Sequence, residues 1–216
     1  MENRFSTIIL LFCLILSGCN GSDKKSGEKR LPDPSIYELS GLVKSTKMFA
    51  RSIGSYEPCF ELRFDADGTC TRHANDAIWE EEGDEVVNEI ERNANGQITR
   101  HITKNKENGR TKFEIHYFYD EKGRVSSSDA LWENNRIITE AHEYNDDNSL
   151  KKTIREERHL AEFLLFKETY LYRNYKFDNQ GNWIERECVR IVKSKEEGET
   201  STSTSTFAEK REILYY

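Results

Sequence analysis

The chain lacks the features that mark nucleic-acid binding or a second hydrophobic membrane segment. Acidic residues outnumber basic ones by 39 to 32, which gives a formal net charge of −7 and a pI near 5.4. Because no basic cluster is present, we expect no nucleic-acid partner. After residues 8–16 no long apolar run occurs, whereas a membrane-spanning helix needs about 20 apolar residues. We therefore expect no transmembrane helix in the rest of the protein.

The sequence also lacks the short motifs of common catalytic and cofactor sites. It contains no glycine-flanked serine, no paired metal-binding histidines and no glycine-rich phosphate loop. His73 and His101 follow two turns at equivalent places, but strands two apart are separated by about 9.6 Å, too far to share a zinc ion. Asp65–Gly68 is similar to the start of a calcium loop that lacks its closing glutamate. We expect no metal, no cofactor and no catalytic residue.

Apolar residues are scarce for a protein of this size. Hydrophobic residues make up 36% and charged residues 33% of the sequence, and the mean hydropathy is −0.82. This composition favours a thin sheet with a solvated face over a thick two-layer core. Residues 39–216 are long enough for one domain. In this domain, Cys59 and Cys70 are expected about 13 Å apart along a hairpin, which is too far for a disulfide bond. We therefore favour buried free thiols at Cys59, Cys70 and Cys188 over a disulfide.

What the first residues do contain is the pattern of an export signal. Arg4 is followed by an apolar run over residues 8–16 and then by Ser17, Gly18 and Cys19. The run is too short to cross a bilayer and is typical of a signal peptide over residues 1–18. Leu16–Cys19 resembles a bacterial lipobox. The resemblance implies cleavage before Cys19 and its acylation with palmitate-type chains, more than one of which stable anchoring to a lipid bilayer requires.

The segment after Cys19 indicates a spacer and a location in the cell. Residues 19–38 are rich in Gly, Ser, Lys, Asp and Glu without apolar periodicity, which predicts a flexible tether behind the lipidated cysteine. Asn20 follows the cysteine, and under the sorting rules of enterobacterial lipoproteins this residue favours the outer membrane. We therefore expect a lipid-anchored protein of the cell envelope, on either the periplasmic or the surface leaflet.

One pattern recurs five times along the rest of the sequence. Each unit has apolar or aromatic residues, then Asp or Asn, and three residues later Gly or Asn. The paired turn residues are Asp65 and Gly68, Asn93 and Gly96, Asp120 and Gly123, Asn145 and Asn148, and Asp178 and Gly181. The fourth turn positions are 28, 27, 25 and 33 residues apart. Such spacing predicts a repeated structural unit.

Each unit is predicted to be a β-hairpin. The Asp or Asn side chain accepts hydrogen bonds from backbone amides ahead of it, and Gly or Asn tolerates the positive φ of a bulged type I turn. The second residue after the turn is apolar every time: Cys70, Ile98, Val125, Leu150 or Trp183. Residues before the turn alternate with period two, as strands require.

Secondary turns between these units predict the overall architecture. They are expected at residues 82–84, 106–109, 133–135 and 196–198. The prediction is an all-β fold, a consecutive antiparallel β-meander of about 10–12 strands in a single curved or open barrel-like sheet. Residues 160–166 could instead be helical, but the β-branched and aromatic residues that follow favour a long strand. Lys210 and Glu212 are expected to protect an exposed final edge.

A family resemblance accompanies these motifs. The units resemble the tyrosine-aspartate repeats of RHS-type proteins, and the sequence is similar to repeat lipoproteins of Bacteroidetes, chiefly over residues 39–45, 177–186 and 210–216. The second unit departs from the pattern, since Arg92 stands where the other units have an aromatic residue. The resemblance implies a fold but no activity, because turn residues specify a hairpin and not a reaction.

The remaining candidates concern binding. Trp79, Trp132 and Trp183, together with ten tyrosines, are expected mostly in the core, and any exposed cluster of them would mark a binding face. Basic residues after the turns are expected to pair with acids on adjacent strands; these are Arg72, Arg100 and Lys152.

The predicted function is that of a membrane-anchored, non-catalytic module that binds a glycan or a protein. Two alternatives stay open. One is a glycan hydrolase that uses acids such as Glu80–Glu82, and the other is an immunity or antitoxin-like lipoprotein, suggested by the kinship of such repeats with toxin systems.

Overall fold

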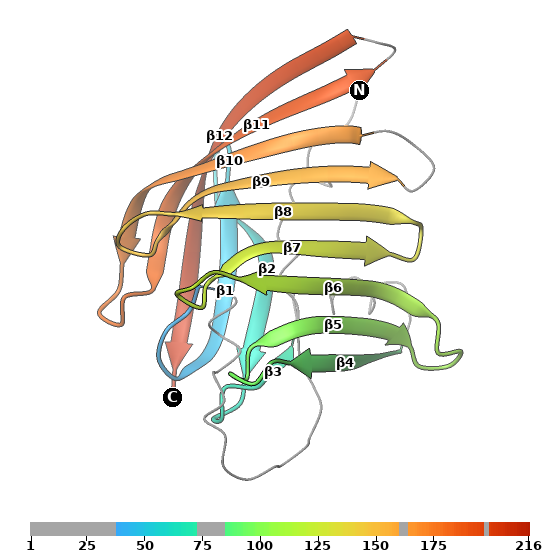
Figure 1. Cartoon of the computed structure of the whole chain (residues 1–216). Helices are drawn as coiled ribbons and strands as arrows, with labels where there is room; N and C mark the ends of the chain where they lie inside the picture. The colour runs from blue at the N-terminus through green and yellow to red at the C-terminus, as the bar shows by residue number, and fades with distance from the viewer. Residues whose placement is uncertain (1–37, 73–84, 160–163, 197–198) are drawn as a thin grey trace.

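All regular structure in the described residues is β-strand. The computed structural model describes residues 38–72, 85–159, 164–196 and 199–216, which form one 12-stranded antiparallel sheet (Figure 1). The all-β prediction is confirmed. The strands are β1 Val43–Arg51, β2 Glu57–Phe64, β3 Cys70–Arg72, β4 Val86–Arg92, β5 Ile98–Asn105, β6 Thr111–Tyr119, β7 Val125–Trp132, β8 Arg136–Tyr144, β9 Leu150–His159, β10 Leu164–Phe177, β11 Trp183–Glu196 and β12 Glu199–Tyr215.

Some sequence predictions fall on residues that the structure does not describe. These are the signal peptide, Cys19, the tether up to residue 37, His73, Trp79, Glu80–Glu82, the turn at residues 82–84, residues 160–163 and most of the turn at residues 196–198. No segment of the described residues forms a helix of the length and hydrophobicity that a membrane crossing requires.

The strand order is a meander whose two ends are joined in an unexpected place. From β4 to β12 each strand pairs with its neighbour in sequence, and β12 then pairs with β1, which continues to β2 and β3. The meander is confirmed, but the expectation that Lys210 and Glu212 protect a free edge is wrong, because both residues lie between β1 and the rest of the sheet. Among the described residues the outermost strands are β3 and β4.

The five turns have one shared geometry. In each, the N–H of the first residue donates to the C=O of the fifth at 2.8–3.0 Å, and the N–H of the fourth donates to the C=O of the first at 2.9–3.1 Å. The fourth residue has a φ between +68° and +83° at Gly68, Gly96, Gly123, Asn148 and Gly181. A register shift lies beside each turn, as in a bulged hairpin.

Tyrosine hydroxyls connect one hairpin to the next. Tyr119 donates to the C=O of Ile98 at 2.6 Å, Tyr144 to Val125 at 2.7 Å and Tyr175 to Leu150 at 2.5 Å. In each case the acceptor is the second residue after the preceding turn. Where Arg92 replaces the aromatic residue, its guanidinium donates to Gly96 within its own turn, and β4 is the strand at which the sheet ends.

The pairing of β12 with β1 has the same geometry as the strand pairs beside the five turns. Gly41 has a φ of +82°, and the second residue after it, Val43, is buried and pairs with Tyr215. Tyr216 donates its N–H to Leu42 at 3.1 Å. The segment Glu38–Gly41 therefore lies where a sixth turn would lie.

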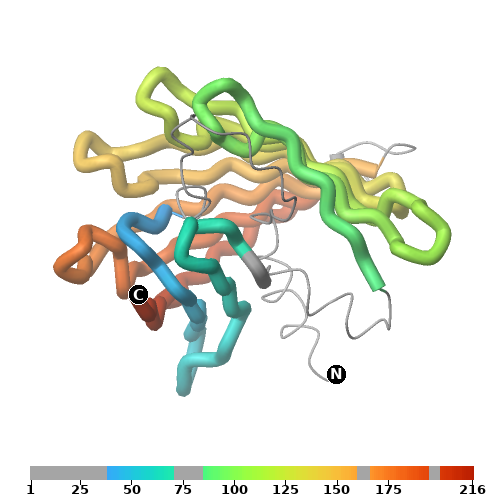
Figure 2. The backbone as a smooth tube through the Cα atoms, turned by 90° about the horizontal axis from the view of Figure 1, so that it is seen from below, coloured from blue at the N-terminus to red at the C-terminus, as the bar shows by residue number. Residues whose placement is uncertain are grey.

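The sheet is strongly curved, so that β1–β3 face β5–β8 across its inner side (Figure 2). Val43, Leu62, Phe64 and Cys70 from the first group pack with residues of the second group into one apolar cluster, which includes Ile98, Phe113, Ile115, Tyr117, Val125, Ala130 and Ile138. Burying these side chains contributes about 1.5–3 kcal/mol for each large one. The core thus depends on residues distant in sequence.

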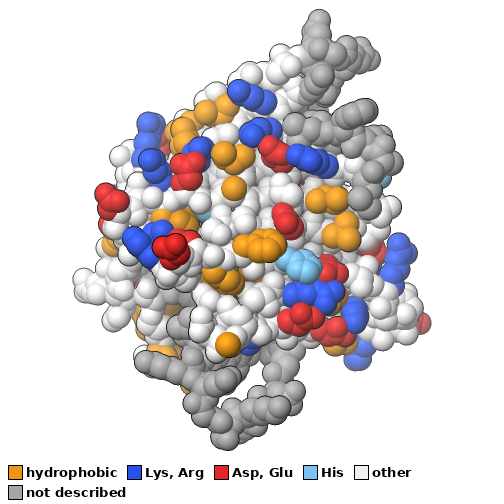
Figure 3. All heavy atoms as spheres, in the orientation of Figure 1, with side chains coloured by type: hydrophobic (Ala, Val, Ile, Leu, Met, Phe, Trp, Pro, Cys, Tyr) orange, Lys and Arg blue, Asp and Glu red, His pale blue; other side chains and the backbone are white. Residues whose placement is uncertain are grey.

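The exposed side chains include basic and acidic residues that lie next to one another (Figure 3). Arg100 pairs with Glu91 at 2.7 Å and Glu114 at 2.8 Å, and Lys152 pairs with Glu143 at 2.6 Å. The prediction of cross-strand ion pairs is confirmed for these two residues. Exposed pairs of this kind contribute about 0–1 kcal/mol each.

Replacing Gly123 with Val should destabilise the protein by about 1–3 kcal/mol, because a β-branched residue is strained at positive φ. Gly123 has a φ of +77°, and an added Cβ would lie 3.3 Å from Gln97 Nε2. Urea denaturation measures the change. Gly123→Asn is the control, since Asn148 occupies the equivalent position. Equal stability of Gly123→Val and Gly123→Asn would contradict the turn assignment.

Removing the Tyr144 hydroxyl should lower stability by about 0.5–1.5 kcal/mol, the usual net contribution of one hydrogen bond. The Tyr144→Phe variant loses the donor to Val125 and keeps the ring. Thermal and urea unfolding are compared with those of Tyr56→Phe, which removes the same atom in the β1–β2 connection. If both variants unfold alike, the hydroxyl does not connect the hairpins energetically.

Candidate functional site

The inner side of the sheet changes character from apolar to ionic toward β8–β12. On these strands buried or half-buried polar side chains replace the aliphatic residues of the core cluster. They are Glu140, His142, Thr153, Arg155, Glu157, Glu168, Tyr170, Tyr172, Arg186, Arg190, Glu209 and Arg211. Burying charge costs free energy, and a buried ion pair is often no more stable than a packed apolar pair. An ionic interior therefore calls for an explanation other than stability.

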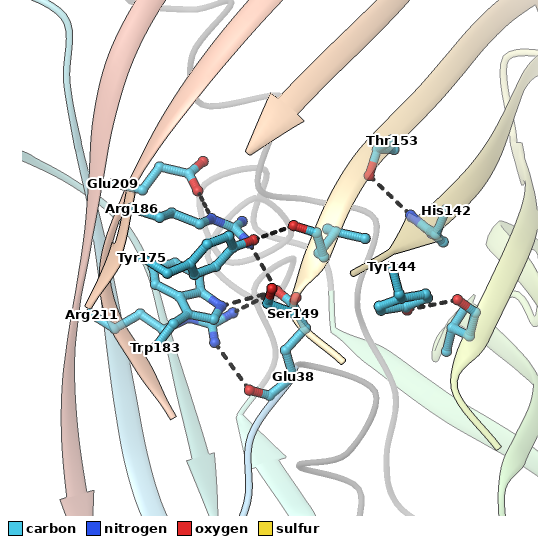
Figure 4. A network of polar contacts seen from close by, with 12 residues as sticks. Glu38, His142, Tyr144, Ser149, Thr153, Tyr175, Trp183, Arg186, Glu209 and Arg211 are labelled. Carbon is cyan, nitrogen blue, oxygen red and sulfur yellow. Dashed lines mark hydrogen bonds and ion pairs between the residues drawn. The ribbon is translucent and has the colours of Figure 1, made fainter. Parts of the chain in front are cut away.

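The most connected part of this region is centred on Glu38 (Figure 4). We define the Glu38 site as Glu38, Trp183, Arg186, Glu209 and Arg211. One carboxylate oxygen of Glu38 accepts from Trp183 Nε1 at 3.0 Å and from Arg186 at 3.1 Å, and lies 3.8 Å from Arg211. Arg186 also donates to Glu209 at 2.5 Å. A residue that precedes β1 thus meets groups of β11 and β12.

The two arginines are also stacked on aromatic rings. The guanidinium carbons of Arg186 and Arg211 lie 4.0 Å and 3.7 Å from the Trp183 ring centroid. Arg186 lies 4.0 Å from the ring of Tyr172 as well. Such cation–π contacts contribute about 0.5–2 kcal/mol each and fix the planes of the guanidinium groups. Trp183 is only 2% exposed, so it belongs to the interior of the site.

The electrostatics of the site are uneven between the two arginines. Burial lowers the pKa of Arg186, but Glu209 and Glu38 outweigh it and raise the pKa well above its usual value. For Arg211 burial dominates, and its pKa falls to about 10 despite Glu38. Burial would raise the pKa of Glu38, yet Arg186 and Arg211 bring it below its usual value. The neighbouring carboxylates therefore stabilise the charged form of Arg211 less than that of Arg186.

A second ionic network lies beside the first. Glu168 contacts Arg155 at 3.6 Å and also accepts from Arg190. Arg155 donates to Glu157 at 3.2 Å, and Arg136 lies 3.0 Å from Glu157. Burial raises the pKa of Glu157 and lowers that of Arg136. Perturbed groups gathered on one face are a common property of binding and catalytic sites.

His101 and His142 occupy separate places in the sheet. His101 is 1% exposed and lies 3.0 Å from Asn88 Oδ1, next to the apolar cluster. His142 faces Thr153 at 3.0 Å and Glu140 at 3.9 Å, and burial raises the pKa of Glu140. Within the described residues, no group of three or more His, Cys, Asp or Glu side chains is arranged to hold a metal ion.

The other predicted residues are placed as follows. Trp132 is half-buried, with its ring edge-on to Phe113 at 4.9 Å and Arg136 over its ring at 5.4 Å. Cys70 and Cys188 are buried and Cys59 is half-buried, and no disulfide joins these three cysteines. Burial raises the pKa of the Cys188 thiol.

Sequence reasoning missed Glu38, Arg186 and Arg211 as a site. The period of two places Arg186, Cys188 and Arg190 on one face of a strand, and this mixture of a thiol with two cations is an available signal. The face that points inward could not be assigned from that period alone. The proximity of Glu38 to β11 and β12 follows only from the pairing of β1 with β12.

Comparisons with known proteins show little. No protein-family model and no curated protein matches the sequence. A similar solved structure is a porin-like protein from Bacteroides uniformis ATCC 8492, with 9% sequence identity, coverage of 82% of this chain and 99% of that chain, and a TM-score of 0.30. At that TM-score the likeness carries no weight for function.

Replacing Glu38 with Gln should lower the melting temperature at pH 7 by about 3–12 °C, if a hydrogen-bonded charge contributes about 1.5–3 kcal/mol. Because folding lowers the pKa of Glu38, its stabilisation is complete above the usual carboxyl pKa near 4.3 and is lost as the pH falls through the lowered folded value. The difference from the wild type should therefore shrink at low pH. Calorimetry at pH 7 and pH 3 measures it.

Glu212→Gln on β12 is the matched control, since that side chain is 55% exposed. A gap between wild type and Glu38→Gln that is the same at both pH values would show that the charge of Glu38 contributes nothing.

Proposed function

We propose that this protein is a lipid-anchored component of the bacterial cell envelope that binds a partner molecule without catalysing a reaction. The Glu38 site, with its half-buried neighbours Tyr144 and Tyr175, is the proposed binding site. The main observation behind this proposal is that Arg186 and Arg211, stacked on Trp183, are buried on an ionic inner face. A few strands away the same sheet forms an apolar core.

The chemistry of the site suits recognition. Guanidinium groups held in fixed planes bind planar anions such as carboxylates with defined geometry. Aromatic and arginine side chains are also the residues that contribute most to binding energy in protein interfaces. The lipobox-like sequence at Leu16–Cys19 supports an envelope address, where acyl groups on Cys19 would hold the module at a bilayer.

Partner capture tests the binding. The wild-type full-length protein in detergent micelles is presented to a glycan array and to envelope extracts. Arg186→Lys should reduce capture at least tenfold, because lysine keeps the charge but loses the stacked, planar donor set. The control is Arg173→Lys, whose side chain is 61% exposed. Blank results for the wild type in both assays would refute the function, and equal capture by the two variants would place binding elsewhere.

Anchoring is tested by replacing Cys19 with Ser. This variant should move from the membrane fraction to the soluble fraction and lose metabolic labelling with palmitate, because the thiol is the expected acylation site. Cys59→Ser is the control, since Cys59 is a half-buried thiol of the sheet. Membrane association unchanged in Cys19→Ser would refute the lipid anchor.

A further inference from the structure

Residues 38–40 lie in and beside the Glu38 site, where they make the kinds of contact that a bound peptide would make. The carboxylate of Glu38 contacts Trp183 and Arg186, and its backbone carbonyl accepts from Arg211 at 3.4 Å. The next side chain, Leu39, is 5% exposed and joins the apolar cluster. These contacts cover an acidic side chain, the backbone carbonyl behind it and an apolar side chain that follows.

Both backbone polar groups of Ser40 are bound as well. The Ser40 N–H donates to Asn182 Oδ1 at 2.5 Å, and Asn182 Nδ2 donates to the Ser40 carbonyl at 2.9 Å. The N–H and C=O that this one amide side chain satisfies belong to two successive peptide groups on either side of one Cα, whereas the acetamido group of a sugar offers both from a single amide. The contacts therefore favour a peptide ligand over a sugar.

The binding groups belong to strands whose pairing does not involve residues 38–40. Trp183 and Arg186 belong to β11 and Arg211 to β12, both fixed by the sheet ladder, and Arg186 is held by Glu209. Residues 38–40 precede β1 and contribute nothing to its pairing. Without Glu38, the site has two guanidinium groups and one carboxylate. Its positive charge then favours an acidic ligand.

The occupant is also held under strain. Glu38 has a φ of +56°, in the left-handed region that a residue with a side chain rarely adopts. The free-energy cost of this backbone conformation opposes the binding of the segment to the site. A separate peptide, free of the connection to β1, is not obliged to adopt this conformation. It can therefore compete with residues 38–40 for the same contacts.

We propose that the Glu38 site binds an extended segment of a partner protein, consisting of an acidic residue followed by an apolar one, and that Glu38–Ser40 occupies the site in the partner's absence. This inference rests on the proposed function and specifies its partner class. Because the cis segment competes at an effective concentration of roughly millimolar, it reduces the apparent affinity for a trans peptide. Removing the cis contacts should therefore raise that affinity.

The test is fluorescence anisotropy with a labelled peptide, Tyr-Glu-Leu-Ser-Gly, the sequence of residues 37–41. The Glu38→Ala/Leu39→Ala variant of the full-length protein in detergent micelles should bind it at least about tenfold more tightly than the wild type. The peptide with Gln in place of Glu is the matched control and should lose this gain. Adding Arg211→Met to the double variant should also abolish the gain.

If the double variant does not fold, as judged by circular dichroism, Glu38→Gln keeps Leu39 in place and is used instead. It should still prefer the Glu peptide to the Gln peptide. A folded variant that binds neither peptide, or both equally, overturns the inference. Envelope capture by the wild-type protein is measured in parallel. If the protein still captures a partner but binds no peptide, the proposed function is retained and only the assignment of this site to a peptide is wrong.

Discussion

The bulged turn is the interaction on which the rest of the structure depends. Its first residue supplies two backbone hydrogen bonds and its fourth adopts positive φ, which fixes how the two flanking strands are paired. Since a slip of one residue would turn every side chain to the other face, this register decides which residues point inward. The buried positions of Ile98, Val125, Leu150 and Trp183, each two residues after a turn, follow directly.

The tyrosine bonds extend this control from single hairpins to the sheet. Tyr119, Tyr144 and Tyr175 each bind the carbonyl of the hairpin before them, so neighbouring turns are held at one rim. At Arg92 the hydroxyl is missing, and the ladder ends on that strand. The curvature of the sheet brings β1–β3 over β5–β8, and a protein poor in apolar residues assembles its core between these two groups of strands.

The sequence allowed the local features to be predicted and left the non-local ones open. Asp120 and Gly123 specify a turn through their own chemistry, so the hairpins and the meander were predictable. The pairing of Val43 with Tyr215 was not, because nothing in either segment identifies the other. That pairing made the edge prediction for Lys210 wrong. It also brings Glu38 to Arg186, so the candidate site could not be assembled from sequence.

The buried charges of the inner face favour a functional interpretation of Arg186 and Arg211 over a purely structural one. If Arg186 and Arg211 served stability alone, apolar residues of similar volume would stabilise the protein as well or better. The attraction within a buried ion pair seldom exceeds the free-energy cost of removing its charges from water. Glu209 accompanies Arg186 on the neighbouring strand, whereas Glu38 comes from outside the ladder and adopts a strained φ. Arg211, whose pKa burial lowers to about 10, relies on that outside carboxylate. A cation that pairs with a carboxylate from outside the sheet ladder fits the proposed binding of an acidic ligand.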